Sequence, residues 1–244
     1  MPAKLSVNIN KYALLRNSRG RGIPNLLAVV DTVVAAGAHG VTVHPRRDQR
    51  HVRLEDVPEI ATHLRAHHPL VELNVECEDH PLLLELVRRV HPDQCTLVPV
   101  TPGEVTSDHG WELPAQVERL KRTVRTLATE GIRTSCFADC APDRIARFAD
   151  TGTERIELYT GPYAWEWGTR HEAREKELVW RSAEAARDVG IAVNAGHDLD
   201  RFNLAGLVGI DGLLEVSIGH ALVCRALEVG TTDAIRELLT ALGW

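Results

Sequence analysis

Eight short runs rich in β-branched and other apolar residues alternate with longer segments of helical periodicity, and this alternation constrains the fold most strongly. The predicted strands are residues 5–10, 40–44, 70–76, 94–100, 133–139, 155–160, 191–197 and 213–218. The predicted helices are residues 26–36, 54–67, 81–90, 113–130, 142–149, 172–189 and 221–229. Because two parallel strands need a long crossover connection, usually a helix, the alternation predicts a parallel sheet of βα units.

Glycines follow several of the predicted helices, and Gly37, Gly131, Gly152 and Gly190 each stand shortly before the next predicted strand. Glycine readily adopts the left-handed conformation that ends a helix and turns the chain. The mean length of the repeating unit is about 30 residues, which a βαβ unit requires. We therefore predict an α/β fold, a (β/α)8 TIM barrel with parallel strands, as a single domain over residues 1–244.

An open, doubly wound sheet is the alternative fold for a sequence that alternates in this way. Its dinucleotide-binding version carries a glycine-rich turn directly after the first strand. The corresponding segment of this chain, residues 8–12 (NINKY), holds no glycine. The barrel is therefore the favoured fold.

The composition excludes several classes of protein. Hydrophobic residues make up 44% and charged residues 25% of the 244 residues, which suits a large buried core and excludes a disordered chain. The formal net charge of −6 argues against broad binding to nucleic acid or to anionic membranes. We expect no membrane span and no signal peptide, because no apolar stretch reaches roughly 18 residues. The five cysteines form no CxxC pair, so we expect reduced thiols and a cytoplasmic protein.

Polar residues close many of the predicted strands. In a parallel barrel the carboxyl ends of the strands meet at one face, where active sites lie. The polar residues at or near the strands' ends are Asn8, Asn10, His44, Glu72, Asn74, Glu76, Asp139, Glu157, Asn194, His197, Glu215 and His220. Each residue alone could be a solvated strand end or a hydrogen-bonded core residue. Because strands from around the whole barrel contribute polar residues to the same face, these structural explanations do not account for the whole set. The sequence therefore predicts an active site at this face.

Two arginine-rich segments follow the first two predicted strands. They contain Arg16, Arg19, Arg21, Arg46, Arg47, Arg50 and His51. The forked guanidinium group suits phosphate oxygens. Gly219 and His220 stand where the last predicted helix begins, and free N–H groups at a helix start favour an anion. We predict a phosphorylated substrate, with an arginine-rich surface as the alternative.

Two histidines and two glutamates fall on four different predicted strands: His44, Glu72, Glu157 and His197. Such a set can bind a divalent metal or transfer protons without one. None of the predicted strands carries a His-x-His pair, which favours proton transfer. Lys11 is a candidate for a Schiff base, although binding an anion or capping a loop is the more common role for such a lysine.

Seven short segments spread over nearly the whole chain carry a family resemblance. They are residues 7–20 (VNINKYALLRNSRG), 41–46 (VTVHPR), 97–99 (LVP), 104–107 (EVTS), 156–161 (IELYTG), 193–197 (VNAGH) and 216–221 (VSIGHA). Together they resemble the pyridoxine 5′-phosphate synthase family. The resemblance implies a TIM-barrel transferase that condenses 3-amino-2-oxopropyl phosphate with 1-deoxy-D-xylulose 5-phosphate. The implied products are pyridoxine 5′-phosphate, phosphate and water, formed by acid/base catalysis without an organic cofactor or a required metal.

The resemblance also implies roles for individual residues. His44 and Glu72 are the expected proton acceptors. His197 is the expected proton donor, and Glu157 is expected to stabilise the charged transition state. The expected substrate contacts are Asn8, Asn10, Lys11, Arg19, Arg46, His51, Thr106, Asp198, Gly219 and His220. The resemblance further implies a homo-octamer, built as a tetramer of dimers.

This chain departs from the family pattern at three places. Asn10 and Lys11 stand where the pattern has Asp-His, which affects the expected contacts to the sugar hydroxyls. Asp198 replaces a glycine after His197, and Pro162 replaces a small residue. None of the three changes removes an expected proton-transfer residue.

The residues themselves are also compatible with two other functions. A metal-dependent sugar-phosphate isomerase or aldolase would use the same histidines and glutamates as ligands and would lose activity with a chelator. A non-catalytic phosphosugar-binding barrel would keep its arginines and Gly219 but would tolerate the loss of His44 and Glu72.

Overall fold

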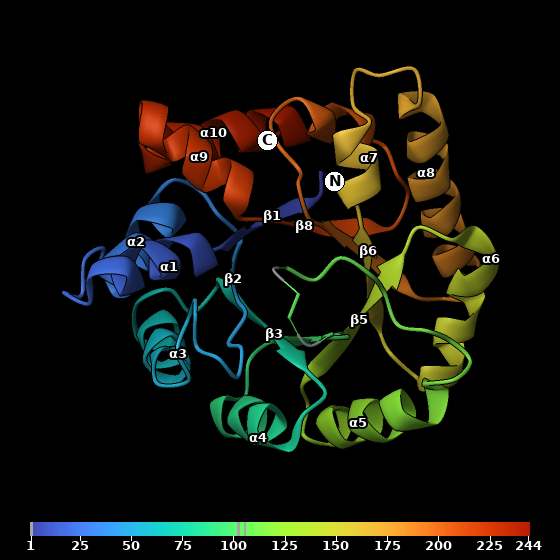
Figure 1. The fold of residues 1–244 in the computed structure, drawn as a ribbon, viewed down its shortest axis with the longest axis horizontal. Coiled ribbons are helices and arrows are strands. Elements are labelled where there is room, and N and C mark those ends of the chain that lie inside the picture. The colour runs from blue at the N-terminus through green and yellow to red at the C-terminus, as the bar shows by residue number, and fades with distance from the viewer. Residues whose placement is uncertain (1, 102, 105) are drawn as a thin grey trace.

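Eight parallel strands close into a ring at the centre of the structure (Figure 1), a computed structural model that describes residues 2–101, 103–104 and 106–244. The strands are β1 (Lys4–Asn8), β2 (Gly40–Val43), β3 (Glu72–Glu78), β4 (Gln94–Val98), β5 (Arg133–Asp139), β6 (Arg155–Tyr159), β7 (Ala192–Gly196) and β8 (Leu213–Ile218). Each strand pairs with the next along the chain, and β8 pairs with β1 to close the ring. The predicted (β/α)8 barrel is confirmed.

Helices surround the ring on its outside (Figure 1). They are α1 (Asn10–Arg19), α2 (Leu26–Ala35), α3 (Asp56–His67), α4 (Pro81–Val90), α5 (Val117–Thr129), α6 (Pro142–Ile145), the 3-10 helix η1 (Ala146–Thr151), α7 (Gly161–Trp165), α8 (Glu172–Asp188), the 3-10 helix η2 (Asn203–Gly206), α9 (His220–Val229) and α10 (Thr231–Leu242). Within the described part of the chain, none of these helices is long and apolar enough to cross a membrane.

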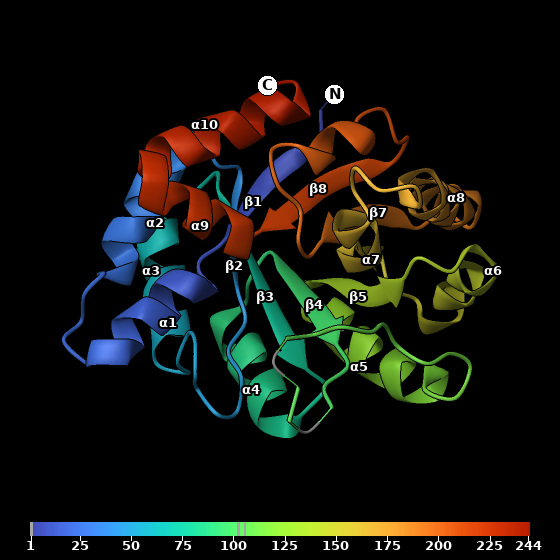
Figure 2. The ribbon, with the colours of Figure 1, turned by 45° about the horizontal axis from the view of Figure 1, so that its top comes forward.

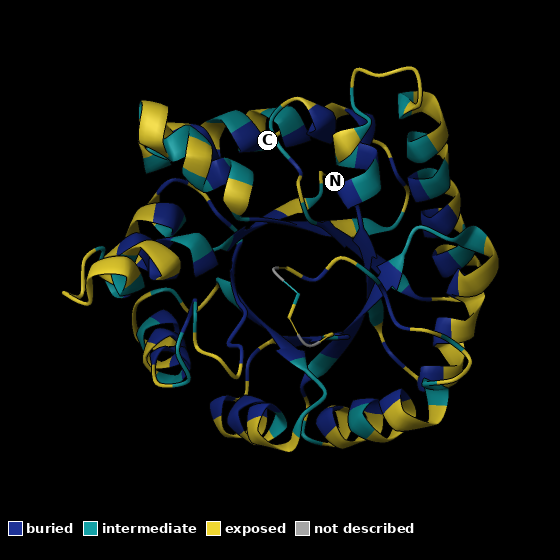
Figure 3. Ribbon diagram, viewed as in Figure 1, coloured by how far each residue is buried: buried dark blue, intermediate teal, exposed yellow. Residues whose placement is uncertain are grey.

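The helices bury one apolar face against the strands and expose the other to solvent (Figure 3). In α4 the buried residues are Leu83, Leu86, Val87 and Val90, which follow the three-and-four spacing of a helix face. Gly190 follows the end of α8 and has a φ of +78°, so it adopts the left-handed conformation predicted for the turn into the next strand. Apolar periodicity therefore directs the packing of helices onto the barrel.

Besides the short α7 and the 3-10 helix η2, two longer helices, α1 and α10, lie outside the predicted set. The segment after β1 was expected to be an arginine-bearing loop, but it forms α1. Two exposed leucines, Leu14 and Leu15, interrupt its apolar pattern, so the periodicity gave no helical signal. The last helix, α10, begins directly after Gly230 and packs against α9 and α2. It adds a further layer beyond the eight repeating units.

Polar side chains fill the barrel interior at several levels between the amino and the carboxyl ends of the strands. Alternate residues of a strand share a face, so Glu72, Asn74 and Glu76 of β3 all point inward. Asn74 donates to Thr42 Oγ1 at 3.3 Å and accepts from Thr96 Oγ1 at 3.0 Å, which forms a neutral layer between the two glutamates. Four residues of strand separate Glu72 from Glu76 by roughly 13 Å. The two carboxylates therefore belong to opposite ends of the barrel.

Candidate active site

A cavity of about 340 Å³ opens at the carboxyl ends of the strands. Its volume lies in the range of small-molecule sites. The lining residues are Asn8, Asn10, Lys11, His44, Arg46, His51, Glu76, Thr106, Glu157, His197, Asp198, Leu199, Ser217, Ile218, Gly219, His220 and Ala221. Most of the residues expected from the sequence thus meet in one place.

His44 and Glu76 form a buried pair at the floor of the cavity. His44 follows β2, Glu76 lies on β3, and Nδ1 of His44 is 3.1 Å from Oε2 of Glu76. Burial raises the pKa of Glu76, but the hydrogen bond from His44 and the charges of His44, His197 and Arg46 outweigh it and lower that pKa. The ionised Glu76 therefore holds Nδ1–H of His44 and leaves Nε2 as the nitrogen that can take a proton.

Glu157 on β6 is the second buried carboxyl of the cavity. Burial, together with the negative charges of Glu76 and Glu215, raises the pKa of Glu157 well above its usual value. A carboxyl with a raised pKa holds its proton to higher pH than an ordinary glutamate and can donate it. Its side chain also explains Gly196 on β7, because a Cβ at that position would lie 2.3 Å from Glu157 Oε1.

His197 is the third candidate for proton transfer. The rings of Phe137 and Tyr159 pack against its imidazole, with centroid distances of 5.0 and 5.4 Å. Burial lowers the pKa of His197, even though the charges of Glu76 and Asp198 raise it. The imidazole is therefore neutral at pH 7 and can first accept a proton and then return it.

The backbone beyond β7 is strained at two successive residues. His197 and Asp198 have φ values of +78° and +57°, which are uncommon for residues with a side chain. The Thr160 hydroxyl lies within hydrogen-bond distance of the carbonyl oxygens of Gly196 and His197, at 2.5 and 2.7 Å. Trp165 Nε1 donates to Asp198 Oδ2 at 2.9 Å. These contacts fix the turn that carries His197.

Two helix N-termini open onto the same cavity. The first residues of α1 (Asn10 and Lys11) and of α9 (His220 and Ala221) line it. Neither helix has an acidic residue in its first turn, so no carboxylate of its own compensates the partial positive charge there, although Asn8 Oδ1 accepts from Asn10 N in α1 at 3.0 Å. At the start of α9, a Cβ on Gly219 would lie 3.0 Å from the Asn8 carbonyl oxygen, so the two segments pack closely. The arrangement suits an anion such as a phosphate group.

Arg46, His51 and Thr106 line another side of the cavity. The Arg46 guanidinium is buried and donates to Glu104 Oε1 at 3.0 Å and to Ser107 Oγ at 3.2 Å. Burial and the charges of nearby cations lower the pKa of His51 to about 4. Its Nδ1 atom is buried and finds no partner within the described ranges. This side therefore offers one cation and one neutral imidazole to a ligand.

Glu104, Thr106 and Ser107 belong to the connection between β4 and α5. In Figures 1 and 2 the described parts of this connection run across the mouth of the barrel. It is attached to β5 by a hydrogen bond from Gly110 N to Asp139 Oδ1 at 2.8 Å. The connection therefore forms part of the cavity wall.

The structure does not bring Glu72 into this cavity. Glu72 is the first residue of β3, where Lys4 Nζ donates to it at 2.9 Å and Arg133 forms a second ion pair with it. Burial raises the pKa of Glu72, but the hydrogen bonds from Lys4 and Arg133 outweigh it and lower that pKa. The expected role of Glu72 needs correction, because its side chain lies at the amino ends of the strands.

Arg19 also lies outside the cavity lining. It is the last residue of α1 and is exposed, about two helical turns from the cavity-lining Lys11. Of the early arginines, Arg16 is instead paired with Asp56 through Nη1 at 2.6 Å and Nη2 at 2.8 Å. Glu76 lines the cavity without being among the residues with an expected individual role, although its position near the end of a predicted strand was the available signal.

Comparison with known proteins places the chain in a family. The model of the family described as "Pyridoxal phosphate biosynthesis protein PdxJ" matches residues 5–243. The chain belongs to the PdxJ family. It is 45% identical over 246 residues to the pyridoxine 5′-phosphate synthase of Mesorhizobium japonicum, with 100% of both chains covered. It is 42% identical to the synthase of Xanthomonas axonopodis pv. citri, with 99% of this chain and 97% of the relative covered.

Solved structures share the fold of this PdxJ family chain at low identity. The tryptophan synthase α-subunit of Pyrococcus furiosus aligns with a TM-score of 0.65 at 16% identity, with 98% of each chain covered. Phosphoribosyl anthranilate isomerase from Thermus thermophilus aligns with a TM-score of 0.58 at 17% identity, again with 98% of each chain covered. These similarities support the barrel fold alone.

The departures from the PdxJ pattern noted above lie within the site. Asn10 uses its Oδ1 to accept from the His44 backbone N at 3.0 Å, so it helps to position His44. Lys11 follows it in the first turn of α1 and lines the cavity. Asp198 stands at a positive φ where a glycine would be unstrained, and the bond from Trp165 holds it there.

Proposed function

We propose that this chain is a pyridoxine 5′-phosphate synthase, a transferase that joins 3-amino-2-oxopropyl phosphate to 1-deoxy-D-xylulose 5-phosphate. The observation that carries the proposal is the meeting of proton-transfer groups and two helix N-termini in one cavity. Membership of the PdxJ family and the names of the full-length relatives support the same activity.

The reaction requires several proton transfers. An amine adds to a ketone, water and phosphate leave, and a carbon–carbon bond closes the ring. Each step takes a proton from one atom and gives a proton to another, so groups able to work in both directions are needed. The cavity offers the imidazole of His44 paired with Glu76, the neutral imidazole of His197, and the carboxyl of Glu157, whose pKa is raised.

In this proposal His44 is the general base and Glu76 positions it. The proton goes to Nε2 of His44, while Glu76 holds Nδ1–H and stabilises the imidazolium that forms. Glu76 therefore takes the part that the family resemblance first suggested for Glu72.

Glu157 and His197 act on the other side of the cavity. The protonated carboxyl of Glu157 donates to oxygen atoms that gain negative charge as bonds break, and so stabilises the transition state. His197 accepts a proton in one step and donates it in a later step, when water or phosphate leaves.

The two phosphate groups bind at the two anion-favouring sides of the cavity. One side consists of the N-termini of α1 and α9, with Lys11 and His220. The other consists of Arg46, His51 and Thr106, where a phosphate would compete with Glu104 for the guanidinium of Arg46. Asn8, Asn10, Asp198 and Gly219 contact the substrates between these two sides.

The decisive experiment is an assay of the purified chain with both phosphorylated substrates, with and without EDTA. We expect pyridoxine 5′-phosphate and inorganic phosphate in equal amounts, at the same rate in both conditions. Activity that disappears with EDTA and returns with a divalent metal would instead favour the metal-dependent sugar-phosphate enzyme. Substrate binding without any product would favour the non-catalytic barrel.

The proposal includes the assembly and location of the enzyme. We propose a single domain over the whole chain, a cytoplasmic enzyme and a homo-octamer built from four dimers. Large apolar side chains support self-association, since Trp165, Phe202 and Leu227 are 63%, 57% and 78% exposed in the single chain. Light scattering is expected to give about eight times the chain mass of 27.0 kDa. The mass of a monomer at micromolar concentration would contradict the assembly.

A further inference from the structure

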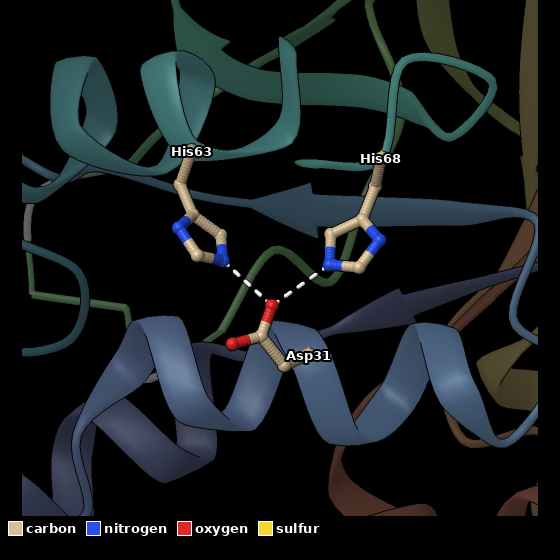
Figure 4. A group of neighbouring side chains, drawn as sticks. All are labelled: Asp31, His63 and His68. Carbon is tan, nitrogen blue, oxygen red and sulfur yellow. Dashed lines mark hydrogen bonds and ion pairs between the residues drawn. The ribbon is translucent and has the colours of Figure 1, made fainter. Parts of the chain in front are cut away.

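Three side chains converge on the outside of the barrel, between α2 and the end of α3. Asp31 lies on α2, His63 lies on α3 and His68 follows α3 directly. Nε2 of His63 and Nε2 of His68 lie 2.6 and 2.7 Å from the same atom, Asp31 Oδ1. Figure 4 shows both imidazole rings pointing at this carboxylate from one side. None of the three residues lines the catalytic cavity.

The local fold fixes the two rings before any ligand arrives. The His68 backbone N donates to the Leu64 carbonyl at 2.7 Å and so anchors the residue that follows the helix. The His63 ring packs against the His67 and His68 rings at centroid distances of 4.7 and 5.8 Å. The side chains of His63 and His68 are only 16% and 22% exposed. Ordered side chains of this kind lose little conformational entropy when they bind a ligand.

The chemistry of the three groups favours a metal ion. Hydrogen bonds from His68 and His63 lower the pKa of Asp31, so its carboxylate is ionised and can only accept. Each imidazole must therefore present a proton on Nε2 in the present arrangement. If that proton is lost and Nδ1 carries the hydrogen, both Nε2 atoms become lone-pair donors next to an anionic oxygen. Two imidazoles and one carboxylate are a ligand set that suits zinc.

The distances are close to those of a metal site. The three ligand atoms lie within 4.8 Å of one another. Zinc bonds of roughly 2.0–2.1 Å in a tetrahedron place neighbouring ligand atoms roughly 3.3 Å apart. Each Nε2···Oδ1 distance would need to lengthen from 2.6 or 2.7 Å by about 0.6–0.7 Å to reach that spacing. The side chain of Asp31 is 51% exposed, and rotation about its torsions can supply a movement of this size.

We propose that Asp31, His63 and His68 form a binding site for a divalent transition-metal ion, with Zn²⁺ as the probe of choice. Water completes the coordination on the exposed side of Asp31. Because the ligands come from α2 and from the end of α3, the bound ion ties these two neighbouring helices together. The site is separate from the catalytic cavity and plays no part in the reaction.

Calorimetric titration of the full-length protein with Zn²⁺, after removal of metal with EDTA and dialysis, tests this site. The double variant His63→Ala/His68→Ala is expected to lose one bound ion per chain, with at least a tenfold loss of affinity. Zn²⁺ should also raise the Tm of the unsubstituted protein by more than it raises the Tm of the double variant. Sites elsewhere on the chain contribute equally to both proteins and cancel in the comparison.

The matched control is His67→Ala, which removes the neighbouring ring that is not one of the three ligands. We expect this variant to keep one bound zinc ion per chain, with a smaller loss of affinity than the double variant, because His67 only packs against the ring of His63. Equal zinc binding by the double variant would overturn the site, and equal loss in His67→Ala would overturn the three-residue ligand set. Since none of these histidines lines the cavity, unchanged kcat/KM and circular dichroism of the metal-free variants separate this result from the test of the proposed function.

Discussion

Replacement of Glu76 by glutamine is expected to lower kcat by roughly 10²–10⁴-fold, the usual contribution of a positioned general base. Glutamine keeps the size of the side chain but removes the charge that holds Nδ1–H of His44. Its amide can instead donate to Nδ1, which leaves the hydrogen on Nε2 and blocks proton acceptance there. Steady-state kinetics with both phosphorylated substrates measures the effect.

The matched control for Glu76→Gln is Glu72→Gln, the same change on the same strand and the same face. Glu72 pairs with Lys4 and Arg133 at the opposite end of the barrel, so its replacement should lower the free energy of unfolding rather than kcat. Thermal unfolding and kinetics of the two variants distinguish these effects. Normal turnover in Glu76→Gln, or lost turnover in a folded Glu72→Gln, would contradict the assignment of the positioning role to Glu76.

Replacement of Glu157 by glutamine is expected to lower kcat by roughly 10²–10³-fold, because the amide cannot give up a proton to the reacting oxygen. The raised pKa of Glu157 sets the sign of the pH dependence. The acid form donates, so the kcat of the unsubstituted enzyme should fall as pH rises through that pKa. The residual activity of Glu157→Gln should lack this alkaline limb.

Glu215 supplies the control for Glu157→Gln, since it is also a buried interior glutamate with a raised pKa, of about 7. It lies on β8 opposite Lys4 in the strand register and does not line the cavity. Glu215→Gln should keep kcat and an alkaline limb, but the limb should move to lower pH, because one of the charges that raise the pKa of Glu157 is removed. If the two variants have the same pH profile, Glu157 is not the proton donor.

The face on which a side chain lies could be predicted from the sequence, but its depth in the barrel could not. The strand pattern around residues 70–76 predicts correctly that Glu72, Asn74 and Glu76 share a face, because alternation has a period of two residues. The observed β3 runs from Glu72 to Glu78, so the predicted strand began and ended two residues too early. A shift of two residues corresponds to roughly 7 Å along the strand, about half of the distance between Glu72 and Glu76, so the strand pattern leaves the depth of each carboxylate undetermined.

The binding partners of the arginines could not be predicted for a different reason. Guanidinium groups suit phosphates and carboxylates equally well, and the sequence does not show which anion is near. The structure pairs Arg16 with Asp56 and leaves Arg19 exposed at the end of α1. By contrast, the place of Gly219 and His220 at the cavity could be predicted, because a helix that begins after a barrel strand directs its N-terminus to the face where the carboxyl ends of the strands meet.

The neutral layer formed by Thr42, Asn74 and Thr96 lies between two compartments of the barrel interior. The lower compartment is at the amino ends of the strands, and the upper compartment is at their carboxyl ends. Ion pairs of Lys4, Glu72 and Arg133 occupy the lower compartment, and the proton-transfer groups occupy the upper one. Laboratory evolution can therefore exchange residues below this layer for thermal robustness and residues above it for substrate scope, provided that Glu215 is kept, because its charge raises the pKa of Glu157 across the layer.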